Sequence, residues 1–383
     1  MNMTADIESV ARLRGPFERD PQNPDLACAI ADASWSIGDN DGARIVLESL
    51  SSPAADIAAV RFRLARCALI AGDYAAAADG YAVMLAASVD SAAVRHDLAF
   101  ALLCLRRTDE AESMVMASIE KYGLSPEVLV LRARIESMRG GYTEAAASAA
   151  EAVILRPDDA SAHGVMALAL FDGGDTEAAL RAVQTALTLD ASQHEALLVA
   201  STVSLGRMDM DAAGRLFERA LARHPNSGRA LSGYGQLHML RNELPDACRT
   251  LEQAVAAMPD HIGTWHALAW AYLLQGRIDD AERCYRSAYD IDRNFGDTHG
   301  GFALVAALRG HFEEADQAAK RALRLDPQAA TARYARALVM ESRGETAEAE
   351  AELADLLPAS CFPGVPVAEF ADRLKARLTG GAN

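Results

Sequence analysis

The residues that decide the fold are WHALAWAYLLQGRIDDAERCYRSAYDI, positions 265–291. Apolar side chains recur three or four positions apart in the first half of this stretch and again in its second half, and Gly276 separates the two halves. Residues with this spacing lie on one face of an α-helix, and glycine tolerates the positive φ that a tight turn needs. The stretch therefore predicts two helices joined in a hairpin.

This hairpin pattern recurs along the chain with a constant period of about 34 residues. Equal steps of this length from Ala281 reach alanine every time, at Ala43, Ala77, Ala111, Ala145, Ala179, Ala213, Ala247, Ala315 and Ala349. A second column holds only small residues, at Ala31, Ala65, Ala99, Ala133, Ala167, Ser201, Gly235, Ala269, Ala303 and Ala337. A turn column holds Gly38, Gly72, Gly140, Gly174, Gly276, Gly310 and Gly344. Four of the units end with proline, at Pro157, Pro225, Pro259 and Pro327. A constant period of this length indicates an array of stacked units.

Small residues at fixed positions indicate where helices cross closely. A small side chain on each helix lets two backbones approach, while larger apolar neighbours fix the register. Each hairpin leaves an apolar face that only the next hairpin can cover, so the units are expected to stack.

A helix–turn–helix unit of this length that contains Trp265, Leu268, Ala269, Tyr272, Ala281, Tyr285 and Ala288 resembles the tetratricopeptide repeat. The resemblance covers nearly the whole chain. It implies an all-α fold, a right-handed α-solenoid of about ten helical hairpins with a capping helix at each end. The pattern departs from the family in two ways: most first helices lack the signature aromatic residue, and Met208 and Asn242 stand in the turn column.

The repeat register divides the chain into three parts. Residues 1–23 form an N-terminal capping segment, with Ile7, Val10, Leu13 and Phe17 at helical spacing and Pro16 interrupting them. Residues 24–363 form ten repeats, which start at 24, 58, 92, 126, 160, 194, 228, 262, 296 and 330. Residues 364–383 form a C-terminal capping helix and tail, in which Phe370, Ala371 and Leu374 occupy core positions. Terminal helices of this kind cover the last apolar face of an array.

The charge and the motifs restrict the function classes. With 37 Lys and Arg against 54 Asp and Glu, the net charge is −17, which argues against nucleic acid and anionic membranes as partners. No export signal or long apolar segment is found, so a cytoplasmic protein is expected. The six cysteines lie far apart, and no phosphate-loop, nucleophile-elbow or metal-ligand motif is present. We therefore expect no enzymatic activity, no metal and no cofactor. The scarcity of Lys favours a bacterial source.

In tetratricopeptide proteins the stacked first helices line a concave groove, and the resemblance places a candidate binding stripe there. Its predicted members are Phe62, Arg66, Phe100, Leu103, Arg134, Leu168, Phe171, Gln236, Met239, Trp270, Leu273 and Leu304. The family's carboxylate clamp of Lys and Asn is missing. Arg66 and Arg134 could bind a carboxylate, or they could be solvated or paired internally.

The predominantly apolar stripe predicts a non-enzymatic adaptor, scaffold or chaperone that holds an apolar helical or extended segment of a partner protein. Two alternatives remain open: the stripe packs against the chain's own neighbouring helices, or the protein self-associates as a homodimer or larger homo-oligomer. The THGGF stretch at 298–302 lies within a predicted first helix, where Gly300 and Gly301 indicate close packing.

Overall fold

A computed structural model describes residues 3–356 of the chain. The expected C-terminal capping helix, with Phe370, Ala371 and Leu374, lies outside the described residues, as do positions 357–363 of the last expected repeat. Within residues 3–356 the fold consists of 21 α-helices and one 3-10 helix, and it has no strand. This confirms the predicted all-α class.

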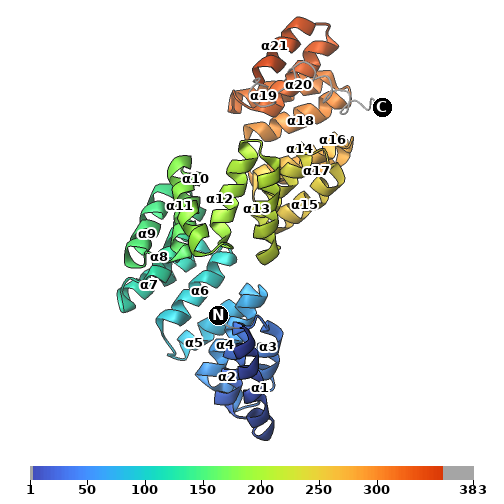
Figure 1. Ribbon diagram of the computed structural model, residues 1–383. Helices are drawn as coiled ribbons and strands as arrows, with labels where there is room; N and C mark the ends of the chain where they lie inside the picture. Colours follow the sequence, from blue (N-terminus) through green and yellow to red (C-terminus); the bar gives the residue numbers. More distant parts are fainter. Residues whose placement is uncertain (1–2, 357–383) are drawn as a thin grey trace. The chain divides into compact units, whose positions relative to one another are not determined.

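The helices group into two compact units, Met1–Ala196 and Leu197–Asn383, and α12 (His194–Gly206) spans the boundary. Unit 1 contains α1 (Met3–Arg19), α2 (Pro24–Ser36), α3 (Asn40–Glu48), η1 (Ala54–Asp56), α4 (Ala58–Ala71), α5 (Tyr74–Ala86), α6 (Ala92–Cys104), α7 (Thr108–Tyr122), α8 (Pro126–Met138), α9 (Tyr142–Leu155), α10 (Ala160–Asp172) and α11 (Thr176–Leu189). Unit 2 contains α13 (Met210–Arg223), α14 (Gly228–Leu240), α15 (Leu244–Ala257), α16 (Ile262–Leu274), α17 (Ile278–Ile291), α18 (Gly296–Leu308), α19 (Phe312–Leu325), α20 (Ala330–Ser342) and α21 (Thr346–Leu356). Each unit is a stack of helical hairpins, an α-solenoid (Figure 1).

The even-numbered helices are the first helices of the hairpins, and from α2 to α20 each begins one full period after the one before. Local capping helps to set these starts: the hydroxyls of Ser91 and Ser125 accept hydrogen bonds from Val94 N and Val128 N. Near the N-terminus of the chain, α1 continues through Pro16 to Arg19. Pro16 removes one intrahelical hydrogen bond, but only three helical residues follow it, and the helix does not end there as the sequence suggested.

The turn between the two helices of a hairpin has one geometry throughout the array. All seven glycines of the turn column have φ between 73° and 92°, and Arg106, Met208 and Asn242 adopt φ near 60° at the three remaining positions. The left-handed conformation is therefore required by the turn itself, and the side chain at that position only changes what the conformation costs.

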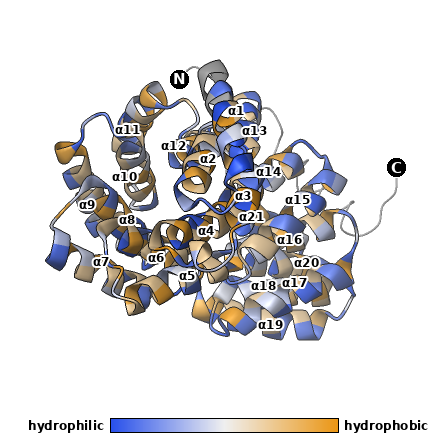
Figure 2. Ribbon diagram, turned by 90° about the horizontal axis from the view of Figure 1, so that it is seen from below, coloured by the Kyte–Doolittle hydropathy of each residue, from blue (hydrophilic) through white to orange (hydrophobic). Residues whose placement is uncertain are grey.

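Both small-residue columns lie in the core. All ten alanines of the first column are 0 % exposed, and every member of the second column is buried. Larger apolar side chains pack around them in a series of clusters between neighbouring hairpins. Figure 2 shows hydrophobic and hydrophilic residues alternating along the helices, as expected when one face of each helix is covered by its neighbours.

The THGGF stretch is a close-packing site, as predicted. A Cβ atom on Gly300 would lie 2.5 Å from the backbone nitrogen of Ala332 in α20, and a Cβ atom on Gly301 would lie 2.3 Å from the ring of Tyr285 in α17. The two glycines therefore let α18 approach both neighbours at once.

Candidate functional site

The predicted binding stripe lies entirely on first helices. In unit 1 its members are Phe62 and Arg66 on α4, Phe100 and Leu103 on α6, Arg134 on α8, and Leu168 and Phe171 on α10. In unit 2 they are Gln236 and Met239 on α14, Trp270 and Leu273 on α16, and Leu304 on α18. The two sets belong to different units and are described separately below.

In unit 1 the apolar members are mostly half-buried. Phe62, Phe100, Leu168 and Phe171 each retain exposed surface, and the Phe62 ring packs edge-on against Tyr81 with the centroids 5.6 Å apart. Leu103 is the exception, because it is only 5 % exposed and belongs to the core. The prediction that Leu103 lines the surface is therefore corrected.

In unit 2 the stripe is interrupted by residues that have no accessible surface. Leu273 and Leu304 are 0 % exposed and pack in the core cluster around α16 to α20, so they are removed from the candidate surface. Gln236 is exposed, and Met239 and Trp270 are half-buried. The Trp270 ring contacts the buried Tyr334 ring edge-on at a centroid distance of 6.1 Å. Trp270 is thus held by the core on one side and open on the other.

The two arginines of the stripe are both engaged within the chain. The exposed Arg66 guanidinium lies over the Trp35 ring at 5.4 Å from its centroid, a cation–π contact. Arg134 donates to Glu195 Oε1 from Nε at 3.0 Å and from Nη2 at 2.7 Å, and it also donates to Ser161 Oγ at 3.2 Å. The sequence left open whether Arg134 binds a ligand carboxylate, is solvated or is paired within the chain, and in the structure it is paired within the chain.

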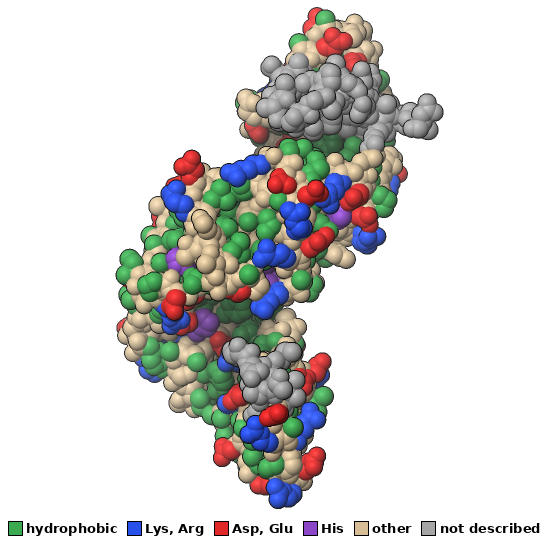
Figure 3. Space-filling view, viewed as in Figure 1, with side chains coloured by type: hydrophobic (Ala, Val, Ile, Leu, Met, Phe, Trp, Pro, Cys, Tyr) green, Lys and Arg blue, Asp and Glu red, His purple; other side chains and the backbone are tan. Residues whose placement is uncertain are grey.

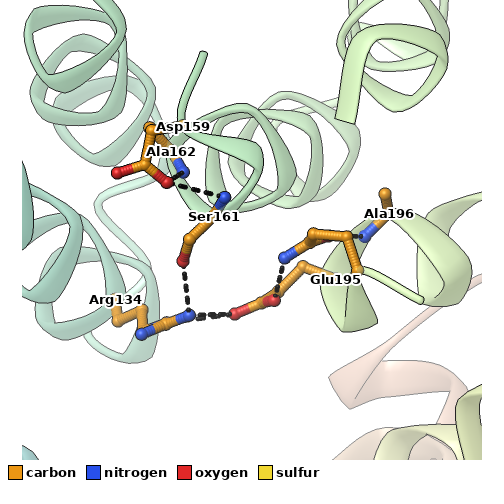
Figure 4. A network of polar contacts seen from close by, with 7 residues as sticks. Arg134, Asp159, Ser161, Ala162, Glu195 and Ala196 are labelled. Carbon is orange, nitrogen blue, oxygen red and sulfur yellow. Dashed lines mark hydrogen bonds and ion pairs between the residues drawn. The ribbon is translucent and has the colours of Figure 1, made fainter. Parts of the chain in front are cut away.

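Arg134 and Glu195 are the centre of a polar network that joins α8 to the start of α12 and passes α10 (Figure 4). Gln193 holds the carboxylate in place: its Nε2 donates to Glu195 Oε2 at 2.6 Å, and its Oε1 accepts from Ala196 N at 2.7 Å. The Gln193 side chain fits there because Gly164 has no Cβ, which would lie 2.0 Å from Gln193 Oε1. A glycine in α10 therefore makes room for a network between its neighbours.

Burial raises the pKa of the Glu195 carboxyl, but attraction and hydrogen bonding from Arg134 lower it more, to about 2. The carboxylate is consequently charged at neutral pH and satisfied by two partners from its own unit. A charge pair of this kind is committed to structure and offers little to a ligand.

In unit 2 hydroxyl and imidazole groups connect the first helices. Thr264 Oγ1 lies 3.4 Å from Ser232 Oγ, His266 Nε2 lies 2.8 Å from Thr298 Oγ1, and Asp297 Oδ1 accepts from Thr331 N at 3.0 Å. Burial raises the pKa of Asp297, whereas His266 and Thr331 lower it more, so the net shift is downward. Sequence reasoning missed this network, although Thr264 and Thr298 occupy the same position of successive repeats.

Unit 2 also contains clefts on the side of the second helices. One cavity of about 370 Å³ is lined by Glu282, Arg286, Tyr289, Phe302, Val305, Ala306, Arg309, His311 and Glu314. A second of about 570 Å³ is lined by His299, Phe302, Glu314, Gln317, Ala318, Lys320, Arg321 and Arg324. The two share Phe302 and Glu314, and we call them together the basic cleft. The sequence signal that could have pointed to it is the run of cations at 320, 321 and 324.

A related cavity of about 240 Å³ lies one repeat earlier. It is lined by Glu252, Val255, Trp265, Leu268, Tyr272, Asp280, Arg283, Cys284 and Ser287. Each of these positions lies one full period before a residue of the basic cleft. The cleft is therefore a recurrent feature of the stacked hairpins, and its lining differs from repeat to repeat.

Other chemistry is sparse in the part of the chain that the structure describes. Cys28, Cys67, Cys248 and Cys284 are buried free thiols, and burial raises the pKa of Cys284 to about 12. No three His, Cys, Asp or Glu side chains between residues 3 and 356 come together as a set of metal ligands. None of the described helices combines the length and hydrophobicity that crossing a bilayer requires.

Comparison with known proteins identifies the repeat. Two tetratricopeptide-repeat family models match, one over residues 226–294 and the other over residues 130–196 and 301–366, together more than half of the chain. A search of the curated proteins gives no match.

The similar solved structures agree in fold. Human IFIT1 as a dimer with m7Gppp-AAAA is 16% identical, with a TM-score of 0.53 over 87% of this chain and 89% of that one. The human IFIT1 dimer with PPP-AAAA is also 16% identical, with a TM-score of 0.52 over 93% of this chain and 94% of that one. YrrB, a tetratricopeptide protein with an unusual peptide-binding site, is 21% identical, with a TM-score of 0.39 over 50% of this chain and 98% of its own. At these identities the likeness to IFIT1 concerns the fold alone.

Proposed function

Because the chain belongs to the tetratricopeptide repeat family, which supports a role as a protein-interaction scaffold, we propose that it is a non-enzymatic adaptor or chaperone. Its ligand is an apolar helical or extended segment of another protein, held on the first helices. The observation that carries this proposal is the set of aromatic side chains on those helices that are packed at one edge and uncovered at the other, notably Phe100, Phe171 and Trp270.

Half-buried aromatic residues suit this role for a physical reason. Their rotamers are already restricted by the core, so binding a partner costs little side-chain entropy on the scaffold side. Large rigid rings also bury much apolar area per residue, which is why they dominate the binding energy of many interfaces. The face drawn in Figure 3 shows hydrophobic side chains set between acidic and basic ones, a mixture that suits a protein ligand.

The burial of individual side chains refines the proposed surface. In unit 1 it comprises Phe62, Phe100, Leu168 and Phe171, and in unit 2 it comprises Gln236, Met239 and Trp270. Arg134 is left out because its guanidinium is paired with Glu195, and Arg66 remains at the edge over Trp35. The net charge of −17 favours a protein partner over nucleic acid. A cytoplasmic location without membrane insertion is part of the same proposal.

The test is an affinity capture from host lysate with mass spectrometry, using three forms of the protein. The first is the wild type, and the second carries Phe100→Ala, Phe171→Ala and Trp270→Ala. The third is a matched control with Val83→Ala, Met116→Ala and Ile154→Ala, three side chains that are more than half exposed on second helices. We expect proteins that are retained by the wild type and the control and lost from the first-helix variant. Equal retention by all three forms would contradict the proposal.

Self-association is a second candidate, supported by the same exposed side chains of unit 1. Ile154 is 77 % exposed, and Val83 and Met116 are 54 % and 52 % exposed, so three successive second helices each present apolar surface that a second copy could cover. Light scattering should then show a concentration-dependent dimer or larger species in the wild type and a monomer in the Val83, Met116 and Ile154 variant. A wild type that stays monomeric at all concentrations would exclude this candidate.

A further inference from the structure

The basic cleft is lined by residues of three consecutive helices of unit 2, α17, α18 and α19, and of the turn between α18 and α19. Figure 1 shows where these helices lie in the chain. It is on the side of the second helices and contains none of the first-helix residues proposed above to hold an apolar segment. An inference about it therefore stands or falls separately from that proposal.

An aromatic cluster forms the base of the cleft. The rings of Tyr289 and Phe302 meet edge-on at a centroid distance of 5.9 Å, and Tyr289 contacts the His299 ring in the same way at 5.6 Å. His299 is fixed by its Nε2, which lies 2.8 Å from the carbonyl oxygen of Arg293. Phe302 and Tyr289 are only half-buried, so their remaining surface faces the cleft. This base offers contact area to an apolar side chain.

Cations surround the aromatic base, together with the carboxylates of Glu282 and Glu314. Arg286 pairs with Glu282, Arg309 pairs with Asp279 and Glu282, and Lys320 Nζ lies 2.8 Å from Asp316. Arg321 and Arg324 on α19 differ, because neither has an ion-pair or hydrogen-bond partner among the residues that the structure describes. Their spacing of three residues places both on one face of α19. Two uncommitted guanidinium groups thus lie beside an apolar base in a protein whose net charge is −17.

The preceding repeat shows that this charge is not a requirement of the fold. At the equivalent positions of that repeat, Ser287 stands for Arg321, Asp290 for Arg324 and Glu252 for Arg286. That cleft is lined by Glu252, Asp280 and a single cation, Arg283, which is paired with Asp280. The same hairpin geometry is therefore compatible with a neutral or acidic lining, and the basic lining needs a different explanation.

We propose that the basic cleft binds an acidic segment of another protein, with carboxylates on Arg321 and Arg324 and an apolar side chain on Phe302. Guanidinium groups bind carboxylates through paired, charge-assisted hydrogen bonds. The attraction is local, since the chain as a whole carries a net charge of −17 and repels an acidic ligand except close to these arginines. A nucleic acid would need a longer run of cations than two uncommitted arginines to offset the overall negative charge.

The test uses a fluorescein-labelled peptide of twelve residues, Glu-rich with one central Phe, and measures fluorescence anisotropy with the full chain. The variant Arg321→Ser/Arg324→Asp carries the residues of the preceding repeat, and Arg283→Gln, which installs the residue found at the equivalent position of the next repeat, is the matched control. We expect the double variant to bind about tenfold more weakly and the control to bind like wild type. Circular dichroism and thermal melting should show that all three forms fold equally.

Further probes decide the nature of the ligand. A peptide with Gln in place of Glu should not bind, a peptide with Ala in place of the central Phe should bind more weakly, and added salt should weaken the wild-type complex. The proposal is overturned if the acidic peptide does not bind at millimolar concentration, if the double variant binds it as well as wild type does, or if a single-stranded oligonucleotide of the same length binds more tightly. Self-association that the double variant abolishes would also overturn it, because the ligand would then be the protein itself.

Discussion

Units 1 and 2 connect their first helices in different ways although both use the same repeat. In unit 1 a guanidinium–carboxylate pair, Arg134 with Glu195, makes such a connection. In unit 2 the contacts between first helices described above use hydroxyl, imidazole and carboxylate groups and a direct backbone approach at Gly300, and ion pairs such as Arg309 with Asp279 lie outside them. Gly164 and Gly300 occupy the same position of their repeats, yet the first accommodates a side chain and the second accommodates a neighbouring helix. A glycine at this position of the repeat leaves room for other atoms, and the neighbouring residues determine whether a side chain or a helix backbone fills that room.

The largest expected effect on stability comes from a substitution that disturbs the close backbone approach in unit 2. In Gly300→Ala the new Cβ would lie 2.5 Å from Ala332 N and 3.0 Å from Ala332 Cα. Backbone atoms cannot move aside without shifting α20, so we expect a loss of about 3 kcal/mol in the free energy of unfolding. Hydrogen exchange should show the loss of protection concentrated in α18 and α20, because repeat arrays respond to damage locally.

The matched control is Gly164→Ala in unit 1. The three atoms nearest to its Cβ would all belong to the amide of Gln193, the far end of a flexible side chain that can turn away. The gain in helix propensity offsets part of the lost hydrogen bonding, so a loss of about 1 kcal/mol is expected. Equal losses of unfolding free energy in the two variants would show that the glycine has the same structural role in both units.

A smaller effect tests the charged connection of unit 1. The pKa of Glu195 is about 2 in the folded chain, below its ordinary value of 4.5, so the stabilisation is complete above pH 4.5 and disappears as pH falls toward 2. Relative to wild type, Glu195→Gln should therefore lose about 2 kcal/mol at pH 7 and progressively less below pH 4.5. Urea unfolding of both proteins at pH 7, 5 and 3 measures the difference. A difference that does not change with pH would mean that the Glu195 charge does not stabilise unit 1.

The sequence predicts the helices and the register of the repeats, but it does not predict how deeply each side chain is buried. The two small-residue columns and the turn column are made of residues one period apart, and this spacing can be read directly from the sequence. Leu304 was misplaced on the surface because its exposure depends on how closely α20 approaches. Leu304 lies one helical turn after Gly300, on the same face of α18, so the helix that the glycine admits also covers the leucine.

The candidate site was predicted in outline only, for a related reason. The period places Arg134 on a first helix, but it does not predict the partner Glu195, which is 61 residues away and belongs to a different position of a later repeat. The repeat pattern of the sequence does not reveal an ion pair between residues whose repeats are separated by another hairpin. The basic cleft was missed because its lining comes from both helices of one hairpin and the second helix of another, so no single helical face displays it.

The smallest expected effect concerns the turn, which is the feature that the two units share. Met208 adopts φ near 60°, a conformation that costs a residue with a Cβ about 1 kcal/mol, whereas Gly276 occupies the same column at φ 73° with no atom near the position of a Cβ. Met208→Gly should therefore stabilise the chain by about 0.5 kcal/mol after the larger backbone entropy of glycine in the unfolded state is subtracted, and Gly276→Met should destabilise it by about as much. Thermal unfolding of the two variants beside wild type checks the pair, and shifts in the same direction would contradict the expectation. Opposite shifts would show that the backbone conformation sets the residue preference in the turn column.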